Sequence, residues 1–304
     1  MDANSIKGFH IEPTNKCTLK CPGCARTRFR NSFSKYWTNQ DLDIDSLFKF
    51  LDIDLNNKSL LFCGVYGDSI YHANFIDMIK ESKSQGANVS ITTNGSYKSL
   101  DWWKSLVSLL SPSDEIIFSV DGDPSNFNQY RINGDWQSIE TGMKVVGSTD
   151  VKSTWRYILF AYNLNSIDTA KNIAQNLNIT NFEVATSHRY DEVTEEYKPA
   201  EEKFLHKKYT PQSMFKKDTS NNVSVDPKCK DNQTHFISAQ GFYSPCCFIA
   251  DHRFYYKTRF AKNQNLYDIS KTTISQILSE PEVVDFYNNL NLHSVCKFNC
   301  PSCS

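Results

Sequence analysis

The sequence predicts an α/β protein built around a mostly parallel sheet. Segments rich in β-branched and aromatic residues alternate with segments of helical period from the N-terminus to about residue 205. Strands that alternate with helices in this way are joined by crossovers that lay them side by side and parallel. Several strand segments are apolar on both faces, as strands covered by helices are. The pattern leaves two closures open, a flat doubly wound sheet or a complete or partial barrel, and in both of them ligands lie at the carboxyl ends of the strands.

The expected strands are short runs bounded by polar or turn-forming residues. Two helices between them are well marked: residues 74–85 end at Gly86, which suits a C-terminal cap, and Ser166 can cap a helix over 166–177 whose apolar residues lie on one stripe. The six expected strands cover residues 7–14, 59–64, 87–93, 114–120, 153–160 and 180–186.

The last third of the chain has a different texture. Residues 207–228 are polar and rich in turn-forming residues, which predicts a linker or surface loop. Two short β-like runs around Gly241 then predict a hairpin. A helical stretch follows over 273–290, with Pro281 inside it as a candidate interruption.

Composition excludes several classes of protein. The 304 residues include 33 Lys and Arg against 34 Asp and Glu, and 13% of them are aromatic. This composition excludes a disordered chain and a general nucleic-acid binder. Arg26, Arg28 and Arg30 could still act locally on phosphates. The first ten residues lack the pattern of a secretory signal, and no window of 18 apolar residues is present. We therefore expect a cytoplasmic protein with no membrane contact.

The ten cysteines fall into two groups at opposite ends of the chain. A reducing cytosol keeps thiols reduced and disfavours a disulfide framework, so metal or redox chemistry is the better interpretation. Cys63 stands apart in an apolar run and is expected to be a small buried residue. The two groups are Cys17, Cys21 and Cys24, and Cys229, Cys246, Cys247, Cys296, Cys300 and Cys303.

The first group stands directly after the first expected strand, with the spacing C-x3-C-x2-C. A loop with this spacing can turn its backbone around one face of a cubane cluster, and thiolates are the usual ligands of iron–sulfur clusters. A four-iron cluster needs four ligands, so three local thiolates leave one position open for a substrate or cofactor. Zinc fits less well, because no histidine stands near these cysteines in the sequence.

This loop, at this place in a chain of repeating strand–helix units, resembles the radical S-adenosylmethionine (SAM) superfamily. The resemblance implies a partial (β/α)6 barrel of the TIM type. It also implies that Cys17, Cys21 and Cys24 hold a 4Fe-4S cluster whose open iron is chelated by the amino and carboxylate groups of SAM. In that family the reduced cluster cleaves SAM to methionine and a 5′-deoxyadenosyl radical.

The resemblance continues after later strands and implies the SAM contacts. Gly64-Val-Tyr-Gly-Asp-Ser69 matches the Gly-Gly-Glu-Pro turn of the family, with Ser69 as a departure at the proline position. Turn sequences such as T-N-G and D-G are common in proteins, so neither is specific by itself. The match depends on the order of these sequences along the chain and on their positions after the expected strands. The implied contacts are Tyr66, Gly67, Asp68, Thr93, Asn94, Ser119, Asp121 and Arg156.

The second cysteine group resembles the SPASM and shorter twitch extensions found behind radical SAM barrels. Cys229 is followed by eleven residues, Gly241, four residues and Cys246, and too few cysteines remain after it for two clusters, which favours one auxiliary 4Fe-4S cluster. A structural zinc site with four thiolates is the alternative. We rank Cys229, Cys246, Cys300 and Cys303 first as ligands, with Cys296 next.

Two domains are expected on this basis. Residues 1–205 form the partial barrel that binds the SAM-cleaving cluster, and residues 206–304 form the SPASM- or twitch-like extension, with a β-hairpin and a helix. The family implies an enzyme of oxidoreductase or transferase type and a reductant such as flavodoxin or ferredoxin as its partner.

The substrate stays open between a small molecule and a peptide. The first strand begins near residue 7, which leaves no room before it for a peptide-recognition domain and favours a small substrate, or a peptide recognised by a separate partner. A non-catalytic electron carrier or structural metal protein is the hypothesis of another class. The resemblance implies that anaerobic sulfatase maturases use an aspartate as proton acceptor at the position where Cys247 stands here, so that role is not carried over. Asp251, His188 and His10 are conceivable acid–base residues, and none of them is assigned as the base.

Overall fold

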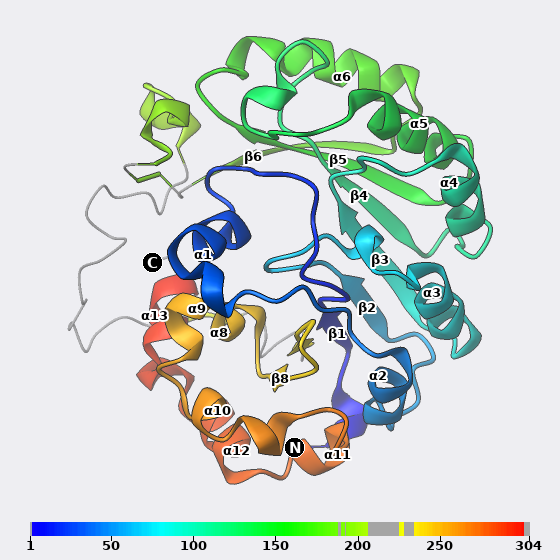
Figure 1. The fold of residues 1–304 in the computed structure, drawn as a ribbon. Coiled ribbons are helices and arrows are strands. Elements are labelled where there is room, and N and C mark those ends of the chain that lie inside the picture. The colour runs from blue at the N-terminus through cyan, green and yellow to red at the C-terminus, as the bar shows by residue number, and fades with distance from the viewer. Residues whose placement is uncertain (1, 188–189, 192, 206–224, 228–233, 301–304) are drawn as a thin grey trace. The chain divides into compact units, whose positions relative to one another are not determined.

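The structure of the chain is a computed structural model that describes residues 2–187, 190–191, 193–205, 225–227 and 234–300 (Figure 1). Its strands form an eight-stranded, mostly parallel sheet in the order β6-β5-β4-β3-β2-β1-β7-β8. The expected α/β class is confirmed, and all six expected strands are present; the strand expected over 153–160 begins and ends one residue earlier, and the other five are shorter than expected. The strands are β1 (Gly8–Ile11), β2 (Ser59–Phe62), β3 (Asn88–Thr93), β4 (Glu115–Ser119), β5 (Lys152–Leu159), β6 (Asn181–Thr186), β7 (Thr234–Ile237) and β8 (Tyr243–Ser244).

The chain divides into two compact units, which are described separately. Unit 1 comprises Met1–Lys16, Thr38–Val89 and Asp218–Ser304, and unit 2 comprises Cys17–Trp37 and Ser90–Lys217. Each unit is a set of residues that contact one another in space. The division into domains at residue 205 follows the sequence and stays a prediction.

In unit 1, β1 lies between two parallel neighbours from distant parts of the chain. Gly8 pairs with Ser59 of β2 on one side and with Thr234 of β7 on the other. The expected hairpin is confirmed: β7 and β8 are antiparallel, and Gly241 between them has φ 78°, a value that glycine adopts readily. The sequence did not predict that the first strand of the hairpin lies beside β1.

The helices of unit 1 are short. The candidate interruption of the expected helix 273–290 at Pro281 is confirmed: the stretch forms two helices, and Pro281 lies in the first turn of the second one, where a missing N–H breaks no hydrogen bond. The helix expected over 74–85 is confirmed with slightly shorter bounds. The helices are α2 (Ile44–Phe50), α3 (Phe75–Ser84), α8 (Cys247–Ala250), α9 (His252–Tyr255), α10 (Arg259–Lys262), α11 (Ile274–Ile277), α12 (Pro281–Asn288) and α13 (Ser294–Asn299).

In unit 2, α4, α5 and α6 lie along one side of the strands β4, β5 and β6 (Figure 1). Ser166 stands at the cap position of its helix but makes no capping bond there, and its hydroxyl accepts a hydrogen bond from the Asn126 side chain instead, so the expected cap is wrong. The core includes the fully buried Trp103, Phe118 and Trp155. The helices are α1 (Ala25–Phe33), α4 (Leu100–Val107), α5 (Trp136–Gly147) and α6 (Ile167–Asn176).

Within the described residues, no helix combines the length and the apolar character needed to cross a bilayer.

Candidate functional site

The first three cysteines lie in a loop of unit 2 that leads into α1. Cys24 stands at the N-cap position of α1, and Cys21 is 8% exposed. Burial raises the pKa of the Cys21 thiol to about 12, although the nearby Arg131 guanidinium acts in the opposite direction. Gly23, between these two cysteines, has no room for a side chain, because a Cβ there would lie 2.4 Å from the Tyr130 hydroxyl oxygen. The loop is therefore packed closely against the rest of its unit.

Arg26 borders all three thiols. It is 7% exposed, and its Nη1 donates a hydrogen bond to the Leu19 carbonyl at 3.3 Å. Burial lowers the pKa of Arg26, while Cys17, Cys21 and Cys24 each act to raise it. Arg26 thus gives these sulfur atoms a common positive neighbour that would stabilise thiolates.

The donor set fits an iron–sulfur cluster by its chemistry. Three thiolate donors with short spacings, beside an arginine, match what such clusters use. In the part of the chain that the structure describes, no three His, Cys, Asp or Glu side chains are gathered tightly enough to enclose a metal ion. By their chemistry, Cys17, Cys21 and Cys24 are the residues that would hold the cluster.

The segment after β3 contacts the cysteine loop. Asn94 is 4% exposed, and its Nδ2 lies 3.7 Å from the Cys17 Sγ as a hydrogen-bond donor. Its Oδ1 accepts from the Ser96 amide at 2.9 Å, and the Thr93 hydroxyl accepts from the Gly95 amide at 3.0 Å. Thr93 and Asn94 are therefore locked in a turn, and the turn presents one donor to a predicted ligand.

Ser119 at the end of β4 and Asp121 just after it are joined by a residue that the sequence did not single out. Arg131 donates from Nε to the Asp121 Oδ2 at 2.6 Å and from Nη2 to the Ser119 Oγ at 3.0 Å. Asp121 is fully buried, and its Oδ1 accepts from the Ile158 amide at 2.9 Å. Burial is the largest single influence and lowers the pKa of Arg131, but Asp121, Cys21 and Tyr130 together raise that pKa above its ordinary value. No motif marks Arg131, because its role depends on contacts outside its own segment.

Arg156 lies on β5 opposite Ser119 of β4. Its Nε forms an ion pair at 2.9 Å with the Glu183 Oε2 on β6, and the two side chains are 37% and 48% exposed. The structure thus gives Arg156 a protein partner. Its contact with the SAM carboxylate stays a prediction.

In unit 1, the turn Gly64–Ser69 is fixed by a buried glutamate that the sequence analysis missed. Glu12 follows β1 and is 1% exposed; its Oε1 accepts from the Tyr66 amide at 2.6 Å and from the Gly67 amide at 3.1 Å. Burial raises the pKa of Glu12, and backbone N–H groups oppose this, that of Ala239 among them. The only signal in the sequence was an acidic residue inside an otherwise apolar strand segment.

Close packing makes glycine necessary at two positions of this turn. A Cβ on Gly67 would lie 1.8 Å from the Thr14 carbonyl oxygen, and a Cβ on Gly64 would lie 2.3 Å from the Gly67 carbonyl oxygen. Asp68 is 7% exposed and accepts from the Ile70 amide at 3.4 Å. The turn therefore lies directly against the chain that leaves β1.

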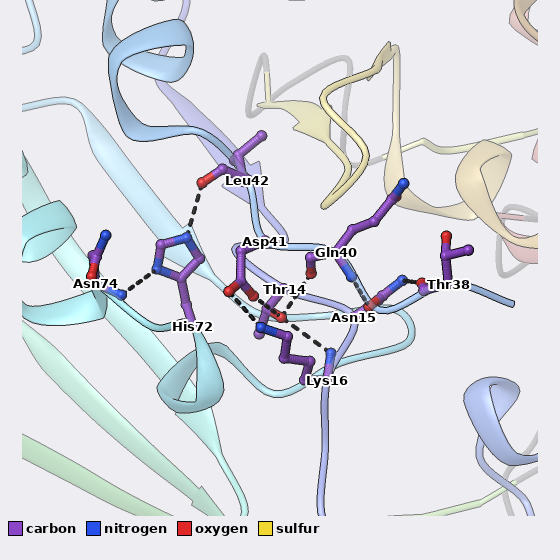
Figure 2. A network of polar contacts seen from close by, with 9 residues as sticks. All are labelled: Thr14, Asn15, Lys16, Thr38, Gln40, Asp41, Leu42, His72 and Asn74. Atoms are coloured by element: carbon purple, nitrogen blue, oxygen red, sulfur yellow. Dashed lines mark hydrogen bonds and ion pairs between the residues drawn. The ribbon is translucent and has the colours of Figure 1, made fainter.

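A polar network holds the chain just before the first cysteine (Figure 2). The Asp41 carboxylate accepts from the Thr14 hydroxyl and pairs with the Lys16 ammonium, both at 2.6 Å. His72 accepts at Nδ1 from the Asn74 amide at 3.1 Å, so its Nε2 donates to the Leu42 carbonyl at 2.9 Å. The network thus ties the end of β1 to two neighbouring segments of unit 1.

Tyr66 contacts the start of α9. Its hydroxyl oxygen accepts from the His252 amide at 2.8 Å and lies 3.3 Å from the His252 Nδ1. Asp251, one of the conceivable acid–base residues, is 6% exposed and has its Oδ1 3.5 Å from the same Nδ1. Burial lowers the pKa of His10 to about 4, which keeps it neutral, and His188 lies outside the described residues.

The C-terminal cysteines lie on elements of unit 1 that contact each other. Cys246 precedes α8, Cys296 is in α13 and is 4% exposed, and α8 contacts α13. The Cys300 carbonyl accepts from the Asp226 amide at 2.9 Å. Two predicted ligands, Cys229 and Cys303, lie outside the described residues.

Two further cysteines were not predicted ligands. Cys247 is the first residue of α8 and is half-buried. Cys63 is also half-buried, not fully buried as expected.

Comparison with known proteins gives no match to any family model. A curated relative, the tungsten-containing aldehyde ferredoxin oxidoreductase cofactor-modifying protein of Pyrococcus furiosus, is 29% identical over 127 residues. The matched part covers 40% of this chain and 33% of the relative, so it spans a minority of the relative's length.

Solved structures show the same fold. SuiB of Streptococcus suis, bound to S-adenosylmethionine, has a TM-score of 0.55 and 15% identity, and the match covers 96% of this chain and 77% of SuiB. SuiB bound to precursor peptide SuiA has a TM-score of 0.59 and 14% identity, with 95% and 67% covered. BtrN in complex with AdoMet and 2-DOIA has a TM-score of 0.51 and 15% identity, with 100% and 96% covered.

Proposed function

We propose that this chain is a radical SAM enzyme. It binds a 4Fe-4S cluster through Cys17, Cys21 and Cys24, cleaves SAM reductively to methionine and a 5′-deoxyadenosyl radical, and removes a hydrogen atom from its substrate. The observation that carries the proposal is the cysteine loop after β1, with Asn94 donating to Cys17 and Arg26 beside all three thiols. A fold shared with proteins solved with SAM supports it.

We propose separate roles in SAM binding for several of the described residues. When bound, the cluster supplies an iron that chelates SAM and the electron that cleaves it. Glu12 fixes the backbone of Tyr66 and Gly67, whose turn is proposed to receive the SAM amino group. This orientation is set before any ligand arrives, because the glutamate is buried and bonded to the protein itself.

We propose that residues of unit 2 also contact SAM. Arg131 holds the Ser119 hydroxyl and the Asp121 carboxylate at fixed positions, and Thr93 and Asn94 form the turn after β3. Arg156 is proposed to exchange Glu183 for the SAM carboxylate, which a half-exposed ion pair permits at small energetic cost.

The substrate class is proposed from the comparisons. SuiB was solved with a precursor peptide, BtrN with 2-DOIA, and the curated relative is named for modifying a cofactor. We favour oxidation or another modification of a small molecule, in a cytoplasmic setting where thiols stay reduced. A maturase that acts on a peptide with a separate recognition partner is the second candidate, favoured by the likeness to SuiB.

The direct test is SAM cleavage by the reconstituted wild type. With dithionite as reductant and no substrate, we expect 5′-deoxyadenosine to accumulate, because cleavage needs only the bound SAM and one electron. Anaerobic incubation followed by chromatography measures it. A fully iron-loaded protein that releases no 5′-deoxyadenosine would rule out the radical mechanism and favour an electron carrier.

We propose further that the C-terminal cysteines hold one auxiliary 4Fe-4S cluster. The contact between α8 and α13, and the bond from Asp226 to the Cys300 carbonyl, support a common location for Cys246, Cys296 and Cys300. Cys229 and Cys303 complete the set of candidates.

Iron analysis of single alanine variants tests this ligand set. Cys246→Ala and Cys300→Ala should each lose about four irons, because an iron deprived of its thiolate is labile. Cys247→Ala is the matched control and should keep the wild-type iron content. Cys296→Ala tests whether Cys296 is a ligand. Retained iron supports Cys300 and Cys303 as the closing pair, whereas lost iron places Cys296 among the ligands. One zinc per chain in place of the second cluster would favour the structural site.

A further inference from the structure

One ring nitrogen of His293 is buried and unpaired within the described residues. This atom, Nε2, is shielded from solvent and has no hydrogen-bond partner in that part of the chain. An unsatisfied buried polar atom costs free energy, so native proteins rarely keep one unless a bound water, ion or cofactor satisfies it. The nitrogen therefore indicates a bound group as the partner of His293.

The ring is in the state that a metal ligand needs. Burial lowers the pKa of His293, and the Asp285 carboxylate and the Phe286 carbonyl oppose this only in part, so the imidazole is neutral near pH 7. A hydrogen bond to the Phe286 carbonyl needs a ring N–H. Because Nε2 makes no hydrogen bond, this N–H is at Nδ1, and Nε2 carries the lone pair. Histidines that bind metals commonly donate from their second ring nitrogen to a carbonyl in this way.

Packing holds the ring in place. Its centroid lies 4.6 Å from that of the Phe286 ring, and the two planes are inclined by 34°. Phe286 is 2% exposed and lies in α12, so the imidazole rests on the core of unit 1. The fold therefore sets the direction of the Nε2 lone pair, as in sites that are organised before the metal binds.

His293 stands on the same element as two predicted ligands. It occupies the N-cap position of α13, and its carbonyl accepts from the Cys296 amide at 3.0 Å. Cys296 and Cys300 follow His293 by three and seven residues, a spacing that places the three positions along one side of a helix. The Cys300 amide donates to the Cys296 carbonyl at 2.8 Å, so the helical spacing extends to Cys300.

A second element brings another thiol to this side of unit 1. Cys246 stands at the N-cap position of α8, and α8 contacts α13 (Figure 1). The described residues thus offer one imidazole and three thiols on two elements that contact each other. Sites with three cysteines and one histidine are an established donor set for zinc, and histidine replaces cysteine on some irons of iron–sulfur clusters.

We propose that the His293 Nε2 is a ligand of the auxiliary cluster, and that it binds one of the four irons while cysteines of the C-terminal group bind the other three. The inference rests on the auxiliary cluster of the proposed function. The bond to iron satisfies the unpaired nitrogen. An imidazole is neutral whereas a thiolate is negative, so a cluster with one histidine carries one negative charge fewer than a cluster with four thiolates and is easier to reduce.

The test uses the full-length protein with Cys17, Cys21 and Cys24 replaced by alanine, in which only the C-terminal cluster is expected to remain. After reconstitution, reduction with dithionite and labelling with 15N-histidine, pulsed EPR should show the coupling of a nitrogen bound directly to the cluster. His293→Ala should lose about four irons, because an iron deprived of its ligand is labile. Ser294→Ala, which changes the exposed neighbouring residue, is the matched control and should keep both the iron and the coupling.

His293→Cys separates ligation from a merely structural role. This variant should keep about four irons but lose the nitrogen coupling, and its cluster should be harder to reduce because a thiolate replaces a neutral ligand. A four-iron cluster without nitrogen coupling in the parent, or with equal coupling in His293→Cys, would overturn the inference and leave the auxiliary cluster in place. A parent that binds no iron would overturn the auxiliary cluster itself. Release of 5′-deoxyadenosine by the wild type tests the radical SAM reaction independently of both outcomes.

Discussion

Replacing Cys17, Cys21 and Cys24 together by alanine is expected to abolish 5′-deoxyadenosine formation. The variant should hold about four of the roughly eight irons of the wild type, because a four-iron cluster without its thiolates is lost and the C-terminal one remains. Colorimetric iron analysis and chromatography of the SAM products measure both effects on one anaerobic preparation.

The control for this variant is Cys63→Ala, a cysteine outside both groups, which should keep all iron and all activity. Circular dichroism should show both variants folded, because alanine removes one sulfur atom at each position and breaks no backbone hydrogen bond. Full iron in the triple variant would show that these cysteines are not ligands. Retained 5′-deoxyadenosine would show that SAM cleavage occurs elsewhere in the molecule.

The second large effect is expected from Arg131→Met. Arg131 and Asp121 form an ion pair at 2.6 Å in which Asp121 is fully buried and the Arg131 side chain is 15% exposed, so removing Arg131 leaves an uncompensated buried charge on Asp121. The free energy of unfolding should fall by ~3–5 kcal/mol. Chemical denaturation measures this loss. Arg156→Met, which breaks the half-exposed pair with Glu183, is the matched control and should lose ~0–1 kcal/mol.

A double variant separates the charge effect from lost packing. Asp121→Asn removes the negative charge but keeps an oxygen that can accept from the Ile158 amide. Asp121→Asn/Arg131→Met should therefore regain part of the stability lost in Arg131→Met, because no unpaired charge remains. Equal losses in Arg131→Met and Arg156→Met would show that the Arg131 pair contributes no more than a surface pair.

The strands could be predicted because each is a local property of the sequence. An apolar run such as 60–63, which stands between Ser59 and Gly64, indicates a buried strand whatever its neighbours are. The pairing of β1 with β7 is not local, and a hairpin in the sequence does not show which sheet it joins. Pro281 could be recognised as an interruption, whereas the choice of two helices depended on its fit to a first turn.

The same distinction applies to the site. The spacing of Cys17, Cys21 and Cys24 carries its own chemistry, so it could be interpreted without a fold. Glu12 and Arg131 acquire their roles from atoms outside their own segments, namely the amides after β2 for Glu12 and the side chains of Ser119 and Asp121 for Arg131. Residues that hold others in place depend on tertiary packing, and a single sequence does not reveal it.

The position of β1 has a consequence for synthesis of the chain. Gly8 leaves the ribosome long before its second neighbour, Thr234, which lies more than two hundred residues later in the sequence. Until then one edge of β1 is open, and an open strand edge can pair with another molecule. Loop closure over such a separation is slow, so nascent or truncated chains that end before β7 are the forms most exposed to aggregation. The first strand completes its pairing only when the last third of the protein has been made.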